Sequence, residues 1–318
     1  MPEGKNGFAI ECKDLVRKFG TFTAVDSLTL QVKTGELFGF LGPNGAGKTT
    51  TINMLTTLLS PSSGIARVAG FDLATQAALV RSRIGVVPQQ FALFEDLTPV
   101  ENLWYIGELY EMGRGILKMR ADELLKIVTL YDKKDIKAGT FSGGMKQRLS
   151  VAASLIHSPQ ILFMDEPTTG LDPQSRLALR ELTQKLNQNG ITIIYTTHDM
   201  EEADKLCQRI GIMDKGKLVA VGTSEQLKSL QGHSHSIQLQ ISRHDGKLVD
   251  ELKQLVGAVS ASYSGGTLEL RVKSLKHGTV HTLTSFLHRK GVDVGDFCIL
   301  EPTLEEVFIS LTKKDLRE

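Results

Sequence analysis

A glycine-rich loop between an apolar stretch and a helical pattern constrains this sequence more than any other feature. Residues 37–41 form an apolar run typical of a buried strand, and residues 50–59 carry apolar side chains at helical spacing. A strand, such a loop and a helix in this order predict an α/β phosphate-loop protein with a mainly parallel sheet. The loop reads G-x-x-x-x-G-K-T and consists of Gly42, Pro43, Asn44, Gly45, Ala46, Gly47, Lys48 and Thr49.

The loop has the chemistry of a nucleotide phosphate site. Its glycines let successive backbone N–H groups turn inward around an anion, and the N-terminus of the following helix adds partial positive charge. Lys48 is placed to reach the β- and γ-phosphates and the Thr49 hydroxyl to ligate Mg²⁺, while Thr50 follows at the same helix start. The alternative is a glycine-rich turn that caps an ordinary helix, but both flanking elements favour the phosphate site.

A pair of acidic residues supplies what phosphate hydrolysis still needs. Residues 161–164 are an apolar run, typical of a strand covered on both faces of a parallel sheet. Asp165 leaves the carboxyl end of that strand, where α/β sheets bind ligands. It can hold Mg²⁺ through water, and Glu166 can polarise the attacking water. Two solvated carboxylates at a strand end are the alternative, which the phosphate loop upstream makes less favoured.

His198 ends another predicted strand. Residues 191–197 form this strand after a turn at Asn189-Gly190. A histidine at this place can donate to a γ-phosphate and orient the water. A strand-end histidine on its own is more often structural, so the functional interpretation depends on the other segments.

Ser142, Gly143 and Gly144 form the most discriminating segment. They precede residues 145–157, whose apolar side chains mark an amphipathic helix. Ser142 can cap this helix, and the two glycines bare backbone donors at its start, which makes a second anion site. One nucleotide in a subunit is already served by the first loop. The second site therefore makes sense if it serves the nucleotide of a partner subunit.

Together these segments resemble the ATP-binding subunits of ABC transporters over about residues 7–230. The Ser-Gly-Gly-Met-Lys-Gln-Arg stretch at residues 142–148 is similar to that family's signature motif, which other phosphate-loop NTPases lack. The resemblance implies Mg²⁺-dependent ATP hydrolysis, with ATP and Mg²⁺ as cofactors. It also implies a head-to-tail dimer, with itself or with a paralogous ATPase subunit, that encloses two ATP molecules between the phosphate loop of one subunit and the signature of the other.

The same resemblance implies roles for single positions. Glu166 matches the catalytic base, His198 the switch histidine, and Gln89 the loop glutamine that senses Mg²⁺ and relays to the membrane partner. Asp172 belongs to the loop that crosses the dimer interface. Phe19 falls where the family places an aromatic side chain under the adenine ring, although a core position would equally account for it.

Composition narrows the setting in which the chain works. The formal net charge of +1 gives no support for a nucleic-acid partner, which needs a basic patch. No span of about 20 apolar residues occurs, so any transmembrane pore must be a separate polypeptide. The first six residues lack the apolar core of a signal peptide, and the three cysteines form no pairs or metal-ligand spacing. We therefore expect a cytoplasmic protein, peripheral on the membrane and docked on a separate transmembrane permease.

Two stretches of the ATP-binding region have patterns of their own. Residues 8–35 alternate apolar and polar side chains, which predicts an antiparallel flap beside the parallel core. Residues 95–140 have a helical pattern, and the resemblance implies a subdomain whose groove receives a coupling helix of the membrane subunit. Aromatic and apolar residues beyond Gln89 line either that groove or the subdomain core, and they are Phe91, Leu93, Phe94, Trp104 and Tyr105.

The tail predicts a second domain. We divide the chain into an ATP-binding domain at residues 1–230 and an accessory domain at residues 231–318, with a polar linker over residues 223–236. Beyond the linker, the periodicities run β-α-β-β-α-β, the ferredoxin-like order. Thr303 and Glu306 then form a capping box for a last helix. This tail is similar to the C-terminal extension of the daunorubicin-resistance type of ABC exporter ATPases, and we expect it to stabilise the dimer or to regulate it.

The sequence thus predicts the ATP-hydrolysing subunit of an ABC-type exporter. A soluble ABC-type ATPase that acts on DNA or the ribosome is the first alternative, but it would need a long coiled coil or a second ATPase cassette. Only one phosphate loop occurs here, and no sustained heptads. A regulatory module that only binds nucleotide is the second alternative, and the presence of Glu166 and His198 argues against it.

Overall fold

The computed structural model describes residues 7–230, 235–242, 246–272, 278–300 and 302–314. The first six residues and part of the predicted linker thus lie outside the described residues. The chain divides into two compact units, Met1–Gly222 and Thr223–Glu318. Each unit is described by itself.

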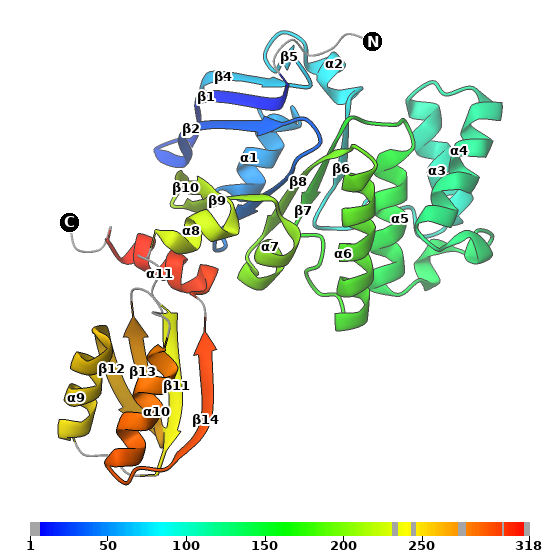
Figure 1. Cartoon of the computed structure of the whole chain (residues 1–318). Coiled ribbons are helices and arrows are strands. Elements are labelled where there is room, and N and C mark those ends of the chain that lie inside the picture. The colour runs from blue at the N-terminus through cyan, green and yellow to red at the C-terminus, as the bar shows by residue number, and fades with distance from the viewer. Residues whose placement is uncertain (1–6, 231–234, 243–245, 273–277, 301, 315–318) are drawn as a thin grey trace. The chain divides into compact units, whose positions relative to one another are not determined.

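A six-stranded sheet forms the centre of the N-terminal unit (Figure 1). Its strand order is β10-β9-β3-β8-β7-β6, and all neighbours are parallel except the β9–β10 hairpin. Every residue of β3, β7 and β8 is buried, as their apolar character predicts for strands covered on both faces. The predicted α/β fold is therefore confirmed. The strands are β3 (Leu37–Leu41), β6 (Ile84–Val87), β7 (Ile161–Asp165), β8 (Thr192–Thr197), β9 (Arg209–Asp214) and β10 (Lys217–Gly222).

Helices that follow these strands lie beside the sheet (Figure 1). The helix after the phosphate loop begins at Lys48 and ends at Leu55, a little shorter than the periodicity predicts. The helix after the signature begins at Gly143, with Ser142 as its cap. These helices are α1 (Lys48–Leu55), α5 (Gly143–Leu155), α6 (Pro173–Gln188) and α7 (Met200–Leu206).

The predicted antiparallel flap is a separate sheet of order β2-β1-β4-β5. Its apolar side chains share one core with residues of the parallel sheet and of α1. Gly64 in this sheet has φ +88°, and a Cβ there would lie 2.2 Å from the carbonyl oxygen of Asp14. The elements are β1 (Phe8–Phe19), β2 (Phe22–Lys33), β4 (Ser63–Val68) and β5 (Phe71–Asp72), followed by α2 (Ala77–Arg81).

Because of this close approach, we expect Gly64→Ala to lower the free energy of unfolding by about 3 kcal/mol, through left-handed strain and overlap together. Gly70→Ala is the matched control, since Gly70 has φ +82° but nothing within 4 Å of the added methyl group. This control should cost only about 1 kcal/mol. Urea unfolding of the parent chain and the two variants measures both losses of unfolding free energy. Equal losses in Gly64→Ala and Gly70→Ala would contradict the steric argument.

The helical pattern of residues 95–140 is confirmed. It contains α3 (Pro99–Leu109) and α4 (Arg114–Ile127), followed by short 3₁₀ turns at Tyr131–Lys133 and Ala138–Thr140. Thr98 and Glu101 form a capping box at the start of α3. Within the described ranges, no helix combines the length and the apolar character needed to cross a bilayer.

The C-terminal unit has the predicted ferredoxin-like order of elements. Its four-stranded antiparallel sheet has the order β12-β13-β11-β14, and its apolar core joins the sheet to α9 and α10. The elements are β11 (His235–Ile241), α9 (Gly246–Val256), β12 (Ala258–Ser264), β13 (Thr267–Val272), α10 (Thr279–Arg289) and β14 (Val294–Leu300).

Short helices flank this sheet domain in the sequence. The last one, α11 (Leu304–Lys314), begins at the predicted capping box, in which Thr303 and Glu306 exchange hydrogen bonds of 3.2 Å. The predicted linker over residues 223–236 is wrong in part, because it contains α8 (Ser224–Ser229) and the start of β11. Thr223 and Gln226 form a second capping box that stabilises α8.

Candidate active site at the carboxyl ends of the parallel strands

Strand register brings three of the predicted segments together. Leu41 at the end of β3 pairs with Thr197 at the end of β8, and Thr196 of β8 pairs with Asp165 at the end of β7. The phosphate loop, the acidic pair and His198 follow these strand ends. They therefore emerge at one edge of the sheet, where parallel α/β sheets place their ligands.

Lys48 is held inside the phosphate loop. Its Nζ donates to the carbonyl oxygens of Gly42 at 2.7 Å and Pro43 at 3.2 Å, and it lies 3.1 Å from Glu166 Oε1. The side chains of Lys48 and Glu166 are only 4% and 8% exposed. Gly47 has φ +101°, and a Cβ there would lie 2.6 Å from the carbonyl oxygen of Ala24. The loop thus needs glycine at this position, which fixes the backbone beside the lysine.

Glu166 has an unusual backbone conformation. Its φ is +44°, a left-handed value that is rare for residues other than glycine. The Glu166 N–H donates to the Thr196 hydroxyl at 2.9 Å and to the Thr196 carbonyl at 3.2 Å. These bonds to the neighbouring strand hold the turn in place. A strained backbone that its surroundings fix in this way is typical of functional sites.

The Glu166 carboxylate is an anion with defined partners. Oε2 lies 3.1 Å from His198 Nδ1 and accepts from the Thr169 hydroxyl at 3.3 Å. Burial raises the pKa of Glu166, but the Lys48 ammonium and His198 outweigh this effect and hold the pKa below its ordinary value. The group is therefore ionised at neutral pH, and His198, which is half-exposed, touches it directly.

Two oxygen groups beside Lys48 fit Mg²⁺. The Thr49 hydroxyl lies 3.3 Å from Asp165 Oδ1, which also accepts from the Thr196 hydroxyl at 2.6 Å. Magnesium prefers such hard oxygen ligands and is usually bound by one or two protein groups together with substrate phosphates. Thr49 and Asp165 are therefore the groups that would hold the ion.

A cavity of about 450 Å³ beside the phosphate loop is lined by half of the predicted nucleotide-binding residues, together with Gln89 and Glu166. Gln89, two residues beyond β6, is one of the residues that line this cavity. The residues that line it are Phe19, Phe22, Ala24, Asn44, Gly45, Gly47, Lys48, Thr49, Thr50, Gln89 and Glu166.

Two exposed aromatic rings border this cavity. Phe19 is 45% exposed, and the Arg17 guanidinium lies 4.5 Å from the centre of its ring. Phe22, 63% exposed, is its cross-strand partner in the β1–β2 hairpin. The sequence analysis missed Phe22, although the two-residue turn at Gly20-Thr21 was a signal that pairs it with Phe19.

The signature segment forms a helix start of its own. The Ser142 hydroxyl accepts from the Met145 N–H at 3.3 Å, so the predicted N-cap is confirmed. A Cβ on Gly143 would meet only Leu171, at 3.5 Å, whereas one on Gly144 would lie 2.1 Å from the Ser175 hydroxyl. Gly144 is thus packed against α6, while the backbone at Gly143 is open.

Asp172 has a structural partner in its own subunit. Its carboxylate caps α6 by accepting from the Ser175 N–H at 3.0 Å, and these hydrogen bonds lower its pKa. Asp172 and the signature residues Ser142, Gly143 and Gly144 are not among the described residues that line the cavity around the phosphate loop. Within one chain, the structure therefore does not bring the signature to the phosphate site.

Comparisons with known proteins agree with this geometry. The family described as "ABC transporter" matches residues 25–169. The linearmycin resistance ATP-binding protein LnrL of Bacillus subtilis (strain 168) is 38% identical over 310 residues, which cover 97% of this chain and 100% of LnrL. The daunorubicin/doxorubicin resistance ATP-binding protein DrrA of Streptomyces peucetius is 40% identical over 309 residues, which cover 96% of this chain and 92% of DrrA.

Solved structures show the same fold. The ATP-binding subunit of an ABC transporter matches with a TM-score of 0.64 and 29% identity, over 70% of this chain and 93% of that one. The dimeric structure of a post-hydrolysis state of the ATP-binding cassette MJ0796, bound to ADP and Pi, matches with a TM-score of 0.60 and 29% identity, over 67% of this chain and 98% of that one. Sequence and fold agree that this chain belongs to the ABC transporter family as an ATP-binding subunit that binds ATP with Mg²⁺ and hydrolyses it.

Proposed function

We propose that the chain powers an exporter by closing as a head-to-tail dimer on ATP, while docked on the cytoplasmic face of a separate transmembrane permease. The observation that carries this proposal is the separation of two phosphate-type segments in one chain. The open helix start at Gly143 is not part of the cavity around Lys48. A second copy, or a paralogous ATPase subunit, would bring its own helix start to that cavity. The dimeric state of MJ0796 with ADP and Pi supports association of two such subunits.

The contacts around the loop support a role for each group that holds the nucleotide. The backbone N–H groups of Gly45–Thr49 and the Lys48 ammonium bind the phosphates. Phe19 stacks on the adenine ring. Thr49 and Asp165 would hold Mg²⁺, and Gln89, which lines the same cavity as Thr49, would sense the ion. When bound, the ion neutralises charge on the phosphate oxygens.

We assign hydrolysis to Glu166, which follows β7, and His198, which follows β8. A water attacks the γ-phosphorus in line with the bond to ADP, that bond breaks, and the Glu166 carboxylate takes the proton of the water. His198 Nδ1, 3.1 Å from Glu166 Oε2, orients this carboxylate and places the other ring nitrogen toward the γ-phosphate. These two roles account for the buried Glu166 carboxylate that stays ionised and for the half-exposed His198 beside it.

A mixing experiment tests the dimer. Gly143→Asp places a carboxylate at the open helix start, where it repels the partner's phosphate, so we expect its turnover to be lost although ATP still binds the intact phosphate loop. Lys48→Ala has the opposite defect, with an intact signature. In a mixed dimer, the intact phosphate loop of Gly143→Asp meets the intact signature of Lys48→Ala, and one complete site forms.

Steady-state ATPase measurements on the separate and mixed variants decide the matter. We expect the mixture to hydrolyse ATP when neither variant does so alone. Gly143→Ala is the matched control, because the added methyl group meets only Leu171, at an ordinary van der Waals distance of 3.5 Å. We therefore expect this variant to unfold at the same temperature as the parent chain. A mixture as inactive as its two components would contradict the shared site.

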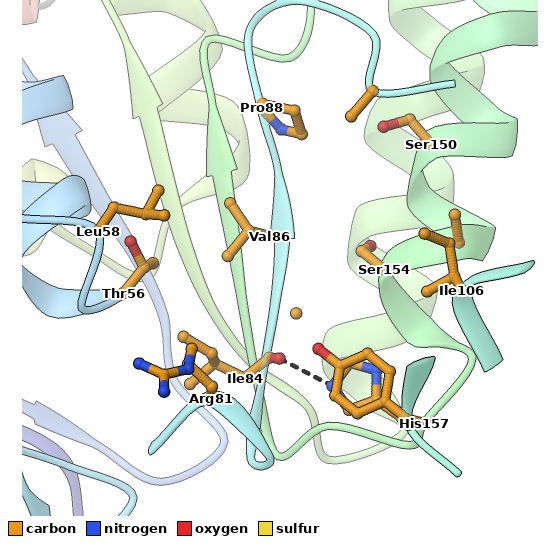
Figure 2. A pocket seen from close by; sticks show the side chains of 14 residues that line it. Thr56, Leu58, Arg81, Ile84, Val86, Pro88, Ile106, Ser150, Ser154 and His157 are labelled. Atoms are coloured by element: carbon orange, nitrogen blue, oxygen red, sulfur yellow. Dashed lines mark hydrogen bonds between the residues drawn. The ribbon is translucent and has the colours of Figure 1, made fainter. Parts of the chain in front are cut away.

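A second surface fits the membrane partner. Figure 2 shows a cavity of about 260 Å³ between β6 and the neighbouring helices, with Val86 on one side and Ile106 and Ser150 on the other. It lies on the segment that leads to Gln89, so an element bound here touches the same stretch of chain as the nucleotide site. Its lining is mainly apolar, which suits burial of an apolar side chain of the permease.

The aromatic residues beyond Gln89 extend this surface. Phe91, Phe94 and Tyr105 are exposed, which favours docking over the subdomain core, whereas Leu93 and Trp104 are half-buried. The rings of Phe94 and Tyr105 meet edge to face at 4.6 Å. Such exposed aromatic pairs are common at protein interfaces. We propose that they hold the permease and keep the chain at the cytoplasmic face of the membrane.

We expect the double substitution Phe94→Ala/Tyr105→Ala to abolish transport by the assembled complex while basal ATPase of the purified chain stays within about twofold, because neither ring borders the phosphate cavity. Met119→Ala on α4 is the control, as its side chain is also exposed but lies on another helix. Transport in membrane vesicles and ATPase of the chain alone are the two measurements. Unimpaired transport in the double variant would place the docking surface elsewhere.

A further inference from the structure

A buried carboxylate behind the active site has no part in the mechanism described so far. Glu202 on α7 is 7% exposed, and three hydroxyl groups donate to it. Tyr195 donates to Oε1 at 2.8 Å, and Thr197 and Thr168 donate to Oε2 at 2.8 and 3.0 Å. In the part of the chain that the structure describes, Glu202 forms no ion pair. Three hydroxyl groups therefore replace the hydrogen bonds to water that this carboxylate loses on burial.

The donors of this cluster come from the two segments that carry the reacting groups. Thr168 lies two residues after Glu166, and Thr197 directly precedes His198. Both threonines donate to the same oxygen of Glu202. One carboxylate oxygen thus joins the segment after β7 to the last residue of β8, which directly precedes His198.

The position of Glu202 is itself well fixed. Its N–H donates to the Asp199 carboxylate at 3.0 Å, and the Asp199 N–H donates to the Thr197 hydroxyl at 2.9 Å. Tyr195 is fully buried, and burial together with the Glu202 charge raises its pKa well above the ordinary value. It therefore remains a hydroxyl donor at all physiological pH values.

The Glu166 turn needs support of this kind. Its left-handed backbone costs about 1–2 kcal/mol and persists only when surrounding contacts hold it. Thr196 supports the turn from one side through the Glu166 N–H. Glu202 supports it from the other, because it fixes Thr168 just beyond the turn.

We propose that Glu202 is a positioning residue for ATP hydrolysis, which keeps Glu166 and His198 in contact by tying together the two segments that carry them. It does not line the phosphate cavity. The inference rests on the roles proposed above for Glu166 and His198, and it is independent of the dimer and of the permease.

Glu202→Gln in the full chain tests this role. The amide keeps the size of the side chain but replaces one acceptor oxygen by a donor, so at least one hydroxyl group loses its partner. We expect kcat to fall by roughly tenfold or more, as small displacements of catalytic groups do, while the KM for ATP stays within about twofold. Glu201→Gln is the control, because the neighbouring Glu201 is exposed and forms an ion pair with Lys205 on the same helix.

Thr168 supplies a matched pair of variants. Thr168→Ser keeps the hydroxyl and should keep kcat, whereas Thr168→Val keeps the shape without the hydroxyl and should lower kcat as Glu202→Gln does. All assays are made well below the unfolding temperature of each variant. If Glu202→Gln lowers only the unfolding temperature and leaves kcat unchanged, Glu202 is merely structural and the proposal is overturned.

A double variant separates this inference from the proposed mechanism. In the Glu166→Gln background, Glu202→Gln should cause no further loss of single-turnover rate, because the Glu166 carboxylate whose contact with His198 it maintains is already absent. A further tenfold loss would show that Glu202 acts independently and would overturn the proposal. Full turnover in Glu166→Gln alone would instead refute the role of Glu166. A dead Glu166→Gln variant with a normal Glu202→Gln variant refutes only the inference made here.

Discussion

Glu166→Gln should hydrolyse ATP about 10²–10⁴ times more slowly than the parent chain and still bind it, because general-base catalysis contributes a factor of this size. The amide cannot accept the proton of the attacking water. ATP binding survives because the Lys48 ammonium keeps its bonds to the carbonyl oxygens of Gly42 and Pro43 and remains available to the phosphates.

Two measurements check this expectation. Steady-state ATPase gives the loss of turnover, and light scattering with saturating Mg·ATP should show a dimer that persists, since hydrolysis no longer resolves it. Glu166→Asp serves as comparison, because its carboxylate is one methylene shorter and should retain part of the rate. Turnover equal to that of the parent chain would remove Glu166 from the role of base.

Lys48→Ala should weaken ATP binding by roughly 10- to 100-fold, as expected for the loss of hydrogen bonds from a charged group worth about 1.5–3 kcal/mol. The phosphates then rely on backbone N–H groups alone. Titration with a fluorescent ATP analogue measures the affinity, with Lys205→Ala as control, because that lysine pairs with Glu201 and does not line the phosphate cavity. Unchanged affinity in Lys48→Ala would contradict the assignment of the loop.

Lys48→Ala should also change how the free energy of unfolding depends on pH. In the parent chain the pKa of Glu166 lies below its ordinary value, so this carboxylate adds to stability above its unfolded pKa of about 4.3 and loses that contribution as the pH falls through the folded value. Without the ammonium, burial dominates and the pKa of Glu166 rises. Thermal unfolding of Lys48→Ala should therefore lose less stability between about pH 5 and pH 3 than the parent chain does. An identical slope would show that the ion pair does not govern this titration.

The parts of the site that could be predicted from the sequence are those in which chemistry follows a buried strand directly. The phosphate loop, Asp165 and His198 come at the ends of apolar runs, and parallel strands bring their carboxyl ends to one edge. The ferredoxin-like order of the tail was predictable for a related reason, since each of its strands and helices has a clear periodicity.

Other parts depend on contacts that no local pattern records. The donors to Glu202 come from residues 168, 195 and 197, and only the pairing of β7 with β8 brings them to one carboxylate. The separation of Gly143 from the phosphate cavity likewise requires the folded chain. The helix α8 was missed because it is short and polar, although Thr223 and Gln226 have the spacing of a capping box.

The ion pair between Lys48 and Glu166 has a consequence for when the enzyme can react. One ammonium neutralises the carboxylate and is also the cation that the terminal phosphate attracts. In the mechanism proposed above, a phosphate that draws the ammonium toward itself would free the Glu166 carboxylate to accept a proton. Under that proposal, binding of the substrate and release of the base from its ion pair are coupled through one shared cation.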